Sequence, residues 1–100
     1  MDQLASAIIE LAREIPKEID WALQVDGHTD IRPIASPTFP SNWELSTARA
    51  ISVVRYLISR GVPPNRLVAA GYGEFRPLET GTDEASLQRN RRIELKLTNR

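Results

Sequence analysis

Apolar residues recur at helical spacing at the start of the chain. Leu4, Ile8, Leu11 and Ile15 follow one another every three or four positions, with charged residues on the other faces. This pattern predicts an amphipathic helix. The helix should end before Pro16, because the residue that precedes a proline is pushed out of helical geometry.

After this proline the apolar period changes from that of a helix to that of a strand. Trp21, Leu23 and Val25 alternate with less apolar residues, which predicts a strand that ends at Gly27. Residues 31–40 then contain three of the seven prolines. Proline cannot donate to a strand ladder or continue a helix, so we predict an ordered loop here. Loops of this length often carry functional residues.

A second helix is predicted to begin after Ser41. Ser41 and Glu44 form a capping box, in which the hydroxyl accepts from a first-turn amide and the carboxylate reaches back to the cap amide. Gly61 and the following Pro63-Pro64 should end this helix. The stripe predicted to be buried consists of Leu45, Ala48, Ile51, Val54 and Ile58.

The rest of the chain predicts two more strands. The apolar run 67–70 indicates a buried strand, and the alternation over 93–97 indicates an edge or hairpin strand with one solvated face. We interpret part of the polar segment 80–89 as a short helix. The fold class is therefore α+β: a two-layer sandwich with a small mixed sheet and helices packed on one face.

The sheet has few strands for two amphipathic helices. We therefore expect a further strand before Asp2, and we interpret residues 1–100 as a single domain that is a fragment of a longer, membrane-anchored protein. Contact with a membrane is expected only through segments absent from this chain, since no stretch of the sequence is long and apolar enough to span a bilayer.

Charge and cysteine content narrow the possible functions. Thirteen basic and thirteen acidic residues give a net charge of +0, so we expect no nucleic-acid partner. Without cysteine the chain has neither disulfides nor a thiolate nucleophile. Its only histidine, His28, is a poor basis for a metal site and is assigned a structural role, and no cofactor is expected.

The chemistry that stands out is an acid and a base on neighbouring elements. Asp30 follows the first strand and Arg49 lies within the next helix, so we expect them to face each other across a solvent-exposed opening. A guanidinium matches a carboxylate bidentately and a carboxylate suits an ammonium, so such an opening would fit a small zwitterion. The alternative is a structural salt bridge between Asp30 and Arg49.

Four blocks of sequence, taken in order, resemble the OmpA-like peptidoglycan-binding domain: Gly27-His28-Thr29-Asp30, residues 42–50 (NWELSTARA), Gly71-Tyr72-Gly73-Glu74 with Pro77, and Asn90-Arg91-Arg92. The sequence of residues 39–46 is most similar to the flagellar-stator MotB branch of that family. The resemblance implies the family's fold and non-covalent binding of peptidoglycan through the diaminopimelate of the stem peptide. It also implies the periplasm of a Gram-negative bacterium, with attachment to the inner or outer membrane through an upstream segment.

The resemblance assigns roles to particular residues. Asp30 is expected to hold the ligand amine and Arg49 its carboxylate. Asn42 is expected to donate a hydrogen bond near the helix start, and Arg91 to form a second cationic wall. The same resemblance adds Thr29 and Leu45 to the ligand site.

Two other functions are considered. One is a dimerisation or structural module, a possible homodimer, that has no direct contact with the wall. The other is an enzyme that uses Asp26 with Asp30 as a carboxylate pair, or Ser46 with His28 and Asp30 as a triad. We expect no catalysis, because Ser46 does not follow a nucleophile-elbow sequence and Asp26 should point away from Asp30.

Overall fold

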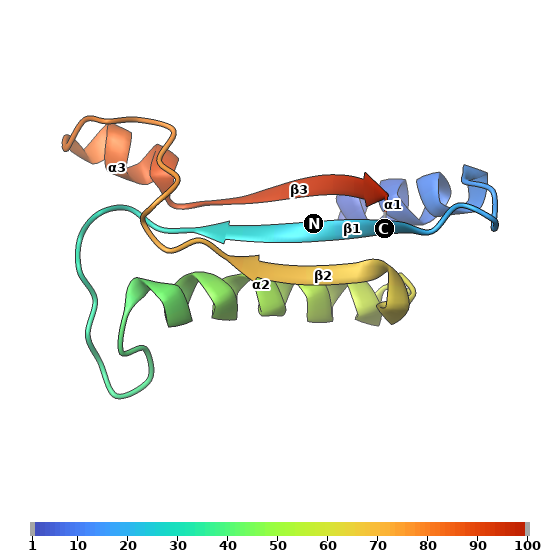
Figure 1. The fold of residues 1–100 in the computed structure, drawn as a ribbon, viewed down its shortest axis with the longest axis horizontal. Helices are drawn as coiled ribbons and strands as arrows, with labels where there is room; N and C mark the ends of the chain where they lie inside the picture. The colour runs from blue at the N-terminus through green and yellow to red at the C-terminus, as the bar shows by residue number, and fades with distance from the viewer. Residues whose placement is uncertain (1, 100) are drawn as a thin grey trace.

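The computed structural model describes residues 2–99, in which helices and strands alternate along the chain (Figure 1). The elements are α1 (Asp2–Glu14), β1 (Trp21–His28), α2 (Asn42–Ser59), the 3-10 helix η1 (Pro64–Arg66), β2 (Leu67–Gly71), α3 (Glu84–Asn90) and β3 (Arg92–Asn99). Each helix and strand predicted within the chain is present in the predicted order. The strand expected before Asp2 lies outside the described residues.

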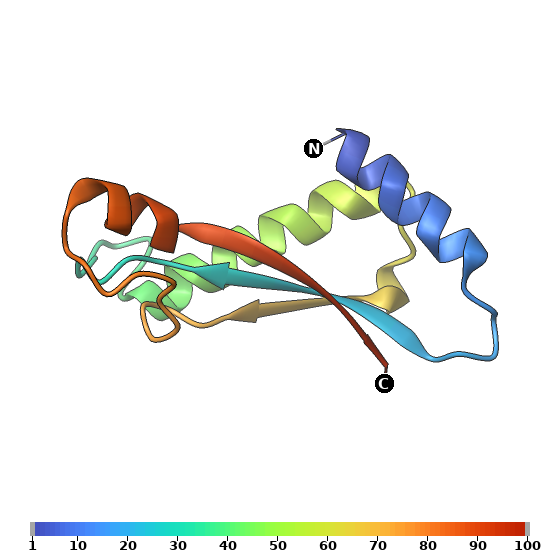
Figure 2. The same ribbon diagram turned by 90° about the horizontal axis from the view of Figure 1, so that it is seen from above.

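The strands form one mixed sheet in the order β2-β1-β3. β1 pairs parallel with β2 and antiparallel with β3, so that Leu23 lies opposite both Leu67 and Leu97. With α1 and α2 on the same side of the sheet, the molecule is the predicted two-layer α+β sandwich (Figure 2). Within residues 2–99, no helix has the length and apolar character needed to cross a membrane.

The helix α2 approaches the sheet closely because a glycine lies beneath it on each of the strands β1 and β2. A Cβ atom added at Gly27 would overlap the backbone carbonyl of Ser46, and one added at Gly71 would overlap the Thr47 hydroxyl. The strands and the helix therefore fit only with small residues at this crossing.

This close approach decides which face of α2 is buried, and the predicted stripe was partly wrong. Ser46, Ala50 and Leu57 are fully buried, whereas Ile51 and Ile58 are 38% and 39% exposed. Small residues face the glycine positions, where bulky isoleucine side chains would not fit. Ile51 and Ile58 consequently lie toward solvent.

The first helix shows the same effect. Ala5 and Ile8 join the core, but Leu4 and Leu11 are 38% and 42% exposed. Periodicity therefore located α1 correctly and misjudged which of two adjacent apolar stripes packs on the sheet. The inward stripe contains alanine at Ala5 and Ala12, which lets the helix axis lie nearer the core.

Several functional segments gather at one end of the molecule, on the left in Figure 1. There β1 and β2 end, β3 begins, and the loop 31–41 leads into the first turn of α2. The short helix α3 lies beyond the strands at this same end rather than on the face that α1 and α2 cover (Figures 1 and 2). This end contains the candidate site.

Candidate ligand-binding site

A pocket of about 210 Å³ opens where β1 ends and α2 begins. Its walls are Thr29, Asp30, Arg32, Pro33, Ile34, Asn42, Leu45, Arg49 and Arg91. These include every residue that the sequence analysis assigned to a ligand site. The tertiary structure thus brings together residues from the end of β1, the following loop, α2 and the residue that precedes β3.

The first turn of α2 fixes the loop wall of the pocket. The Ser41 hydroxyl accepts from the Trp43 amide at 3.2 Å and donates to the Glu44 carboxylate. The Glu44 carboxylate therefore reaches back to the cap residue, as the capping box predicts. The buried Asn42 side chain donates to the Arg32 carbonyl at 3.1 Å, so its amide nitrogen holds the loop in place.

The Asp30 carboxylate is enclosed by two guanidinium groups. Its Oδ1 accepts from the Arg32 backbone amide at 2.9 Å, and its Oδ2 accepts from Arg32 Nη2 at 2.7 Å and from Arg91 Nη1 at 2.6 Å. Asp30 is only 5% exposed. The expectation that this carboxylate is open to solvent was wrong, because the two arginines cover it.

Arg49 differs from the other arginines of the pocket. Among the hydrogen bonds and ion pairs of residues 2–99, none involves its guanidinium, although it lines the same pocket as Asp30. The alternative of a structural Asp30–Arg49 salt bridge is therefore wrong as well. Asp30 has its structural partners in Arg32 and Arg91, which leaves Arg49 available to a ligand.

Glu84 of α3 links the two arginines that hold Asp30. It accepts from Arg91 Nη2 at 3.0 Å and lies 3.5 Å from Arg32 Nη1. Asp30, Arg32, Glu84 and Arg91 thus form a ring of alternating charges that sum to zero. Adding Arg49 gives the pocket a net positive charge, which favours a ligand that carries an anionic group.

The charge ring also sets the protonation state of Asp30. Burial acts to raise the pKa of this carboxyl, but the hydrogen bonds from Arg32 and Arg91 outweigh it and lower the pKa from 3.8 to about 2. Asp30 is therefore ionised at neutral pH, as an acceptor for a cationic ligand group must be.

Arg32 and Glu84 are the charged residues of the site that sequence reasoning missed. Arg32 lies two positions after Asp30, close enough in the loop for a carboxylate to bond both its amide and its side chain, so the spacing Asp-x-Arg was a usable signal. Glu84 lies far along the chain, and only the placement of α3 brings it to the pocket.

A larger hollow, of about 400 Å³, lies along α2 but lacks comparable chemistry. It is lined by Thr38, Phe39, Trp43, Glu44, Thr47, Ala48 and Ile51. Its charged residue, Glu44, is already bonded to Ser41. The smaller pocket is the better candidate, because it holds together an ionised carboxylate and a guanidinium that no residue of 2–99 pairs with.

Ser46 and His28, two of the groups considered for catalysis, are each held by other partners. Ser46 is fully buried, where its hydroxyl donates to the Trp43 carbonyl and accepts from the Gly73 amide. His28 instead stacks on Tyr72, with ring centroids 5.1 Å apart. Ser46 is thus committed to the turn after β2 and not to the imidazole.

The sequence matches the OmpA family over residues 2–91. The chain belongs to the OmpA family. This OmpA-family domain is 39% identical over 95 residues to the uncharacterized protein YtxE of Bacillus subtilis, a match that covers 94% of this chain and 38% of YtxE. It is 46% identical over 72 residues to the peptidoglycan-associated lipoprotein of Pseudomonas aeruginosa, covering 72% of this chain and 40% of the lipoprotein.

The fold agrees with solved structures of the same family. The periplasmic domain of Helicobacter pylori MotB superimposes with a TM-score of 0.82 at 29% identity, covering 99% of this chain and 62% of that chain. The resemblance inferred from the motif blocks is thereby confirmed. The OmpA-family chain spans about two fifths of the length of the curated relatives named above.

Proposed function

We propose that this domain binds bacterial peptidoglycan non-covalently, through the diaminopimelate of the stem peptide, and anchors its parent protein to the cell wall. The observation that carries the proposal is one pocket that holds the ionised carboxylate of Asp30 and the guanidinium of Arg49, which has no partner among the described residues. Diaminopimelate carries an ammonium and a carboxylate on one carbon, so it supplies both complementary charges. Homology to a peptidoglycan-associated lipoprotein supports the same ligand.

Arg49 is the proposed partner of the ligand carboxylate. It lies in the 18-residue helix α2, and the pocket that it lines also contacts Asn42, the first residue of that helix. A helix start contributes amide donors and a partial positive charge, which favour an anion there by about 0.3–1 kcal/mol. The ligand carboxylate thus meets a free guanidinium where the helix field is also favourable.

The ligand ammonium is proposed to replace Arg32 on Asp30. The Arg32 side chain is 53% exposed, whereas that of Arg91 is 28% exposed. Arg32 therefore gives up less packing when it swings away, and Glu84 remains as its partner. Because one ion pair is exchanged for another, a single site should bind weakly, and firm attachment would come from many domains on one polymer.

The proposed location is the outer side of the cytoplasmic membrane, where the wall lies. One solved relative is a periplasmic domain of a motility protein, and relatives also occur in Bacillus subtilis. A periplasmic site in a Gram-negative bacterium, attachment to one membrane or the other, and service in a flagellar stator remain predictions that follow from the family resemblance.

Binding without catalysis is part of the proposal, and it is supported by the other partners that hold the Ser46 hydroxyl and the His28 ring. A dimerisation module remains the alternative. The two hypotheses separate by experiment, because only the binding hypothesis requires single charge changes in the pocket to abolish contact with the wall.

The test is co-sedimentation of the purified chain with insoluble peptidoglycan. Arg49→Ala should abolish sedimentation, whereas Arg55→Ala, an equal charge change on the exposed side of the same helix, should leave it intact. Free diaminopimelate should compete, and Nα-acetyl-lysine amide, whose ammonium has no carboxylate on the same carbon, should compete poorly. If both variants sediment like the wild type, the site assignment is wrong; if the wild type does not sediment, the function is wrong.

A further inference from the structure

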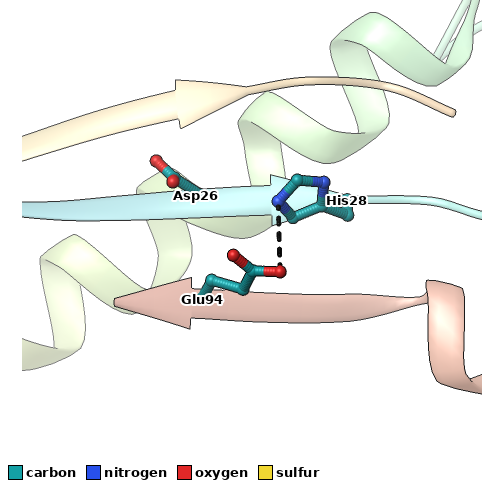
Figure 3. Close-up of side chains that lie close together, drawn as sticks. All are labelled: Asp26, His28 and Glu94. Atoms are coloured by element: carbon teal, nitrogen blue, oxygen red, sulfur yellow. Dashed lines mark ion pairs between the residues drawn. The ribbon is translucent and has the colours of Figure 1, made fainter. Parts of the chain in front are cut away.

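The sheet face opposite α1 and α2 carries a cluster of possible metal ligands (Figure 3). Asp26 and His28 lie two positions apart on β1 and therefore share one face of the sheet. Glu94 lies directly opposite Asp26 on β3. One donor atom from each of the three lies within 4.8 Å of the others. This cluster is separate from the ligand pocket, and none of its members lines that pocket.

The histidine at its centre has an unusual environment. His28 is 3% exposed, yet among the described residues neither ring nitrogen has a hydrogen-bond partner. Nε2 faces the Glu94 carboxylate, but at 3.9 Å the separation is too long for a hydrogen bond (Figure 3). Buried polar groups are nearly always paired, so an orphaned imidazole between two carboxylates calls for a partner.

The protonation state of His28 suits a metal ligand. Burial, with a further contribution from the nearby Arg92 charge, lowers its pKa below 6.5. The imidazole is therefore neutral at pH 7 and has a free lone pair. Its stacking on Tyr72 holds the ring plane fixed, so the ring nitrogens keep a defined direction.

Both carboxylates already accept hydrogen bonds from neighbouring side chains, as ligating carboxylates usually do. Gln24 donates to Asp26 Oδ1 at 2.8 Å, and Arg92 Nε donates to Glu94 Oε2. Lys96 Nζ lies 3.0 Å from Asp26 Oδ2, and its side chain is 53% exposed. Lys96 thus occupies the cation position beside Asp26 and can leave it for solvent.

We propose that Asp26, His28 and Glu94 bind a divalent transition-metal ion of the Zn²⁺ type, which displaces the Lys96 ammonium. One imidazole nitrogen and two carboxylate oxygens are a common donor set for such ions, with ligand distances of about 2.0–2.2 Å. The Glu94 side chain is 34% exposed, so packing does not fix its position. Water would complete the coordination.

The remaining cation determines how tightly the site binds. Arg92 stays on Glu94 through contacts to the Asn90 and Arg76 carbonyls, so its charge opposes the metal in any state. Lys96 opposes it by direct competition for Asp26. The site should therefore bind Zn²⁺ more weakly than one without neighbouring cations, and removing the Lys96 charge should tighten it.

The test uses the tag-free chain and ZnCl2. Because His28 is the only histidine, ring-nitrogen resonances in a long-range ¹H–¹⁵N spectrum report on it alone. One equivalent of Zn²⁺ should shift one ring nitrogen, and calorimetry should give a stoichiometry near one. Lys96→Gln should tighten binding by about fivefold or more, and Glu94→Gln should weaken it by about tenfold.

Glu10→Gln, the same change on the exposed surface of α1, is the matched control and should alter neither signal. The proposal is overturned if Zn²⁺ leaves the His28 resonances of the wild type unchanged, or if Lys96→Gln binds no better than the wild type. Wall binding is expected to be the same with and without Zn²⁺, so failure here would not affect the proposed function.

Discussion

Arg32 holds the carboxylate of Asp30 through both its backbone amide, at 2.9 Å, and its guanidinium, at 2.7 Å. The same carboxylate is the proposed acceptor for the ligand ammonium. The loop thus supplies a substitute cation from within the chain, and the ligand must compete with it. This relationship makes Arg32 a residue whose removal should improve binding.

Arg32→Gln is expected to bind diaminopimelate more tightly than the wild type. The variant retains Arg91 on Asp30 but removes the competing guanidinium, so the affinity should rise by about fivefold. Calorimetric titration with the free amino acid measures this. Weaker binding would mean that Arg32 contacts the ligand carboxylate and does not compete with the ammonium.

Asp30→Asn should destabilise the fold at neutral pH. The pKa of Asp30 is lowered from 3.8 to about 2, so its ionised form contributes roughly 2 kcal/mol above pH 4. Because the folded pKa is depressed, this contribution is lost as the pH falls from about 4 toward 2. In urea unfolding, the free energy of unfolding should therefore be lower for the variant than for the wild type at pH 7, and the two values should converge near pH 2. A gap that is independent of pH would contradict the ion-pair account.

Gly27→Ala should be strongly destabilising, because its Cβ would overlap the backbone carbonyl of Ser46. Overpacking of this kind costs about 1–3 kcal/mol, and here the obstructing atom belongs to helix backbone that cannot move aside. At Gly81 the nearest atoms belong to the side chains of Asp83 and Ser86, so Gly81→Ala should cost less. Thermal unfolding of the two variants checks the close helix approach. Equal losses would argue against it.

His28 should give the metal-free protein a second pH dependence, which begins near pH 6.5, above the onset of the Asp30 transition. Its pKa is lowered by burial, so below about pH 6.5 the unfolded chain binds a proton that the folded chain does not. Stability should therefore decrease as the pH falls from 6.5 toward the folded pKa. His28→Gln should remove this slope while the Asp30 transition at lower pH remains. An NMR midpoint at or above 6.5 in the folded protein would contradict the burial effect.

The order of elements and the family were readable from the sequence. Local sequence is enough to find these elements, because each signal has a local physical cause. The signals are the helical spacing around Ile8, the alternation at Leu23 and Val25, and the capping residues before α2. The motif blocks did more, because they named six residues that all line one pocket.

What the tertiary structure alone decided is which side chains meet. The alternation on β1 placed Asp26 and His28 on one face, but only the antiparallel register with β3 sets Glu94 opposite Asp26. Likewise, Arg91 and Glu84 reach Asp30 because α3 packs at the end of the sheet. Local propensity fixes an element and its candidate faces, while partner choice depends on contacts between segments far apart in the chain, and sequence spacing carries no record of those.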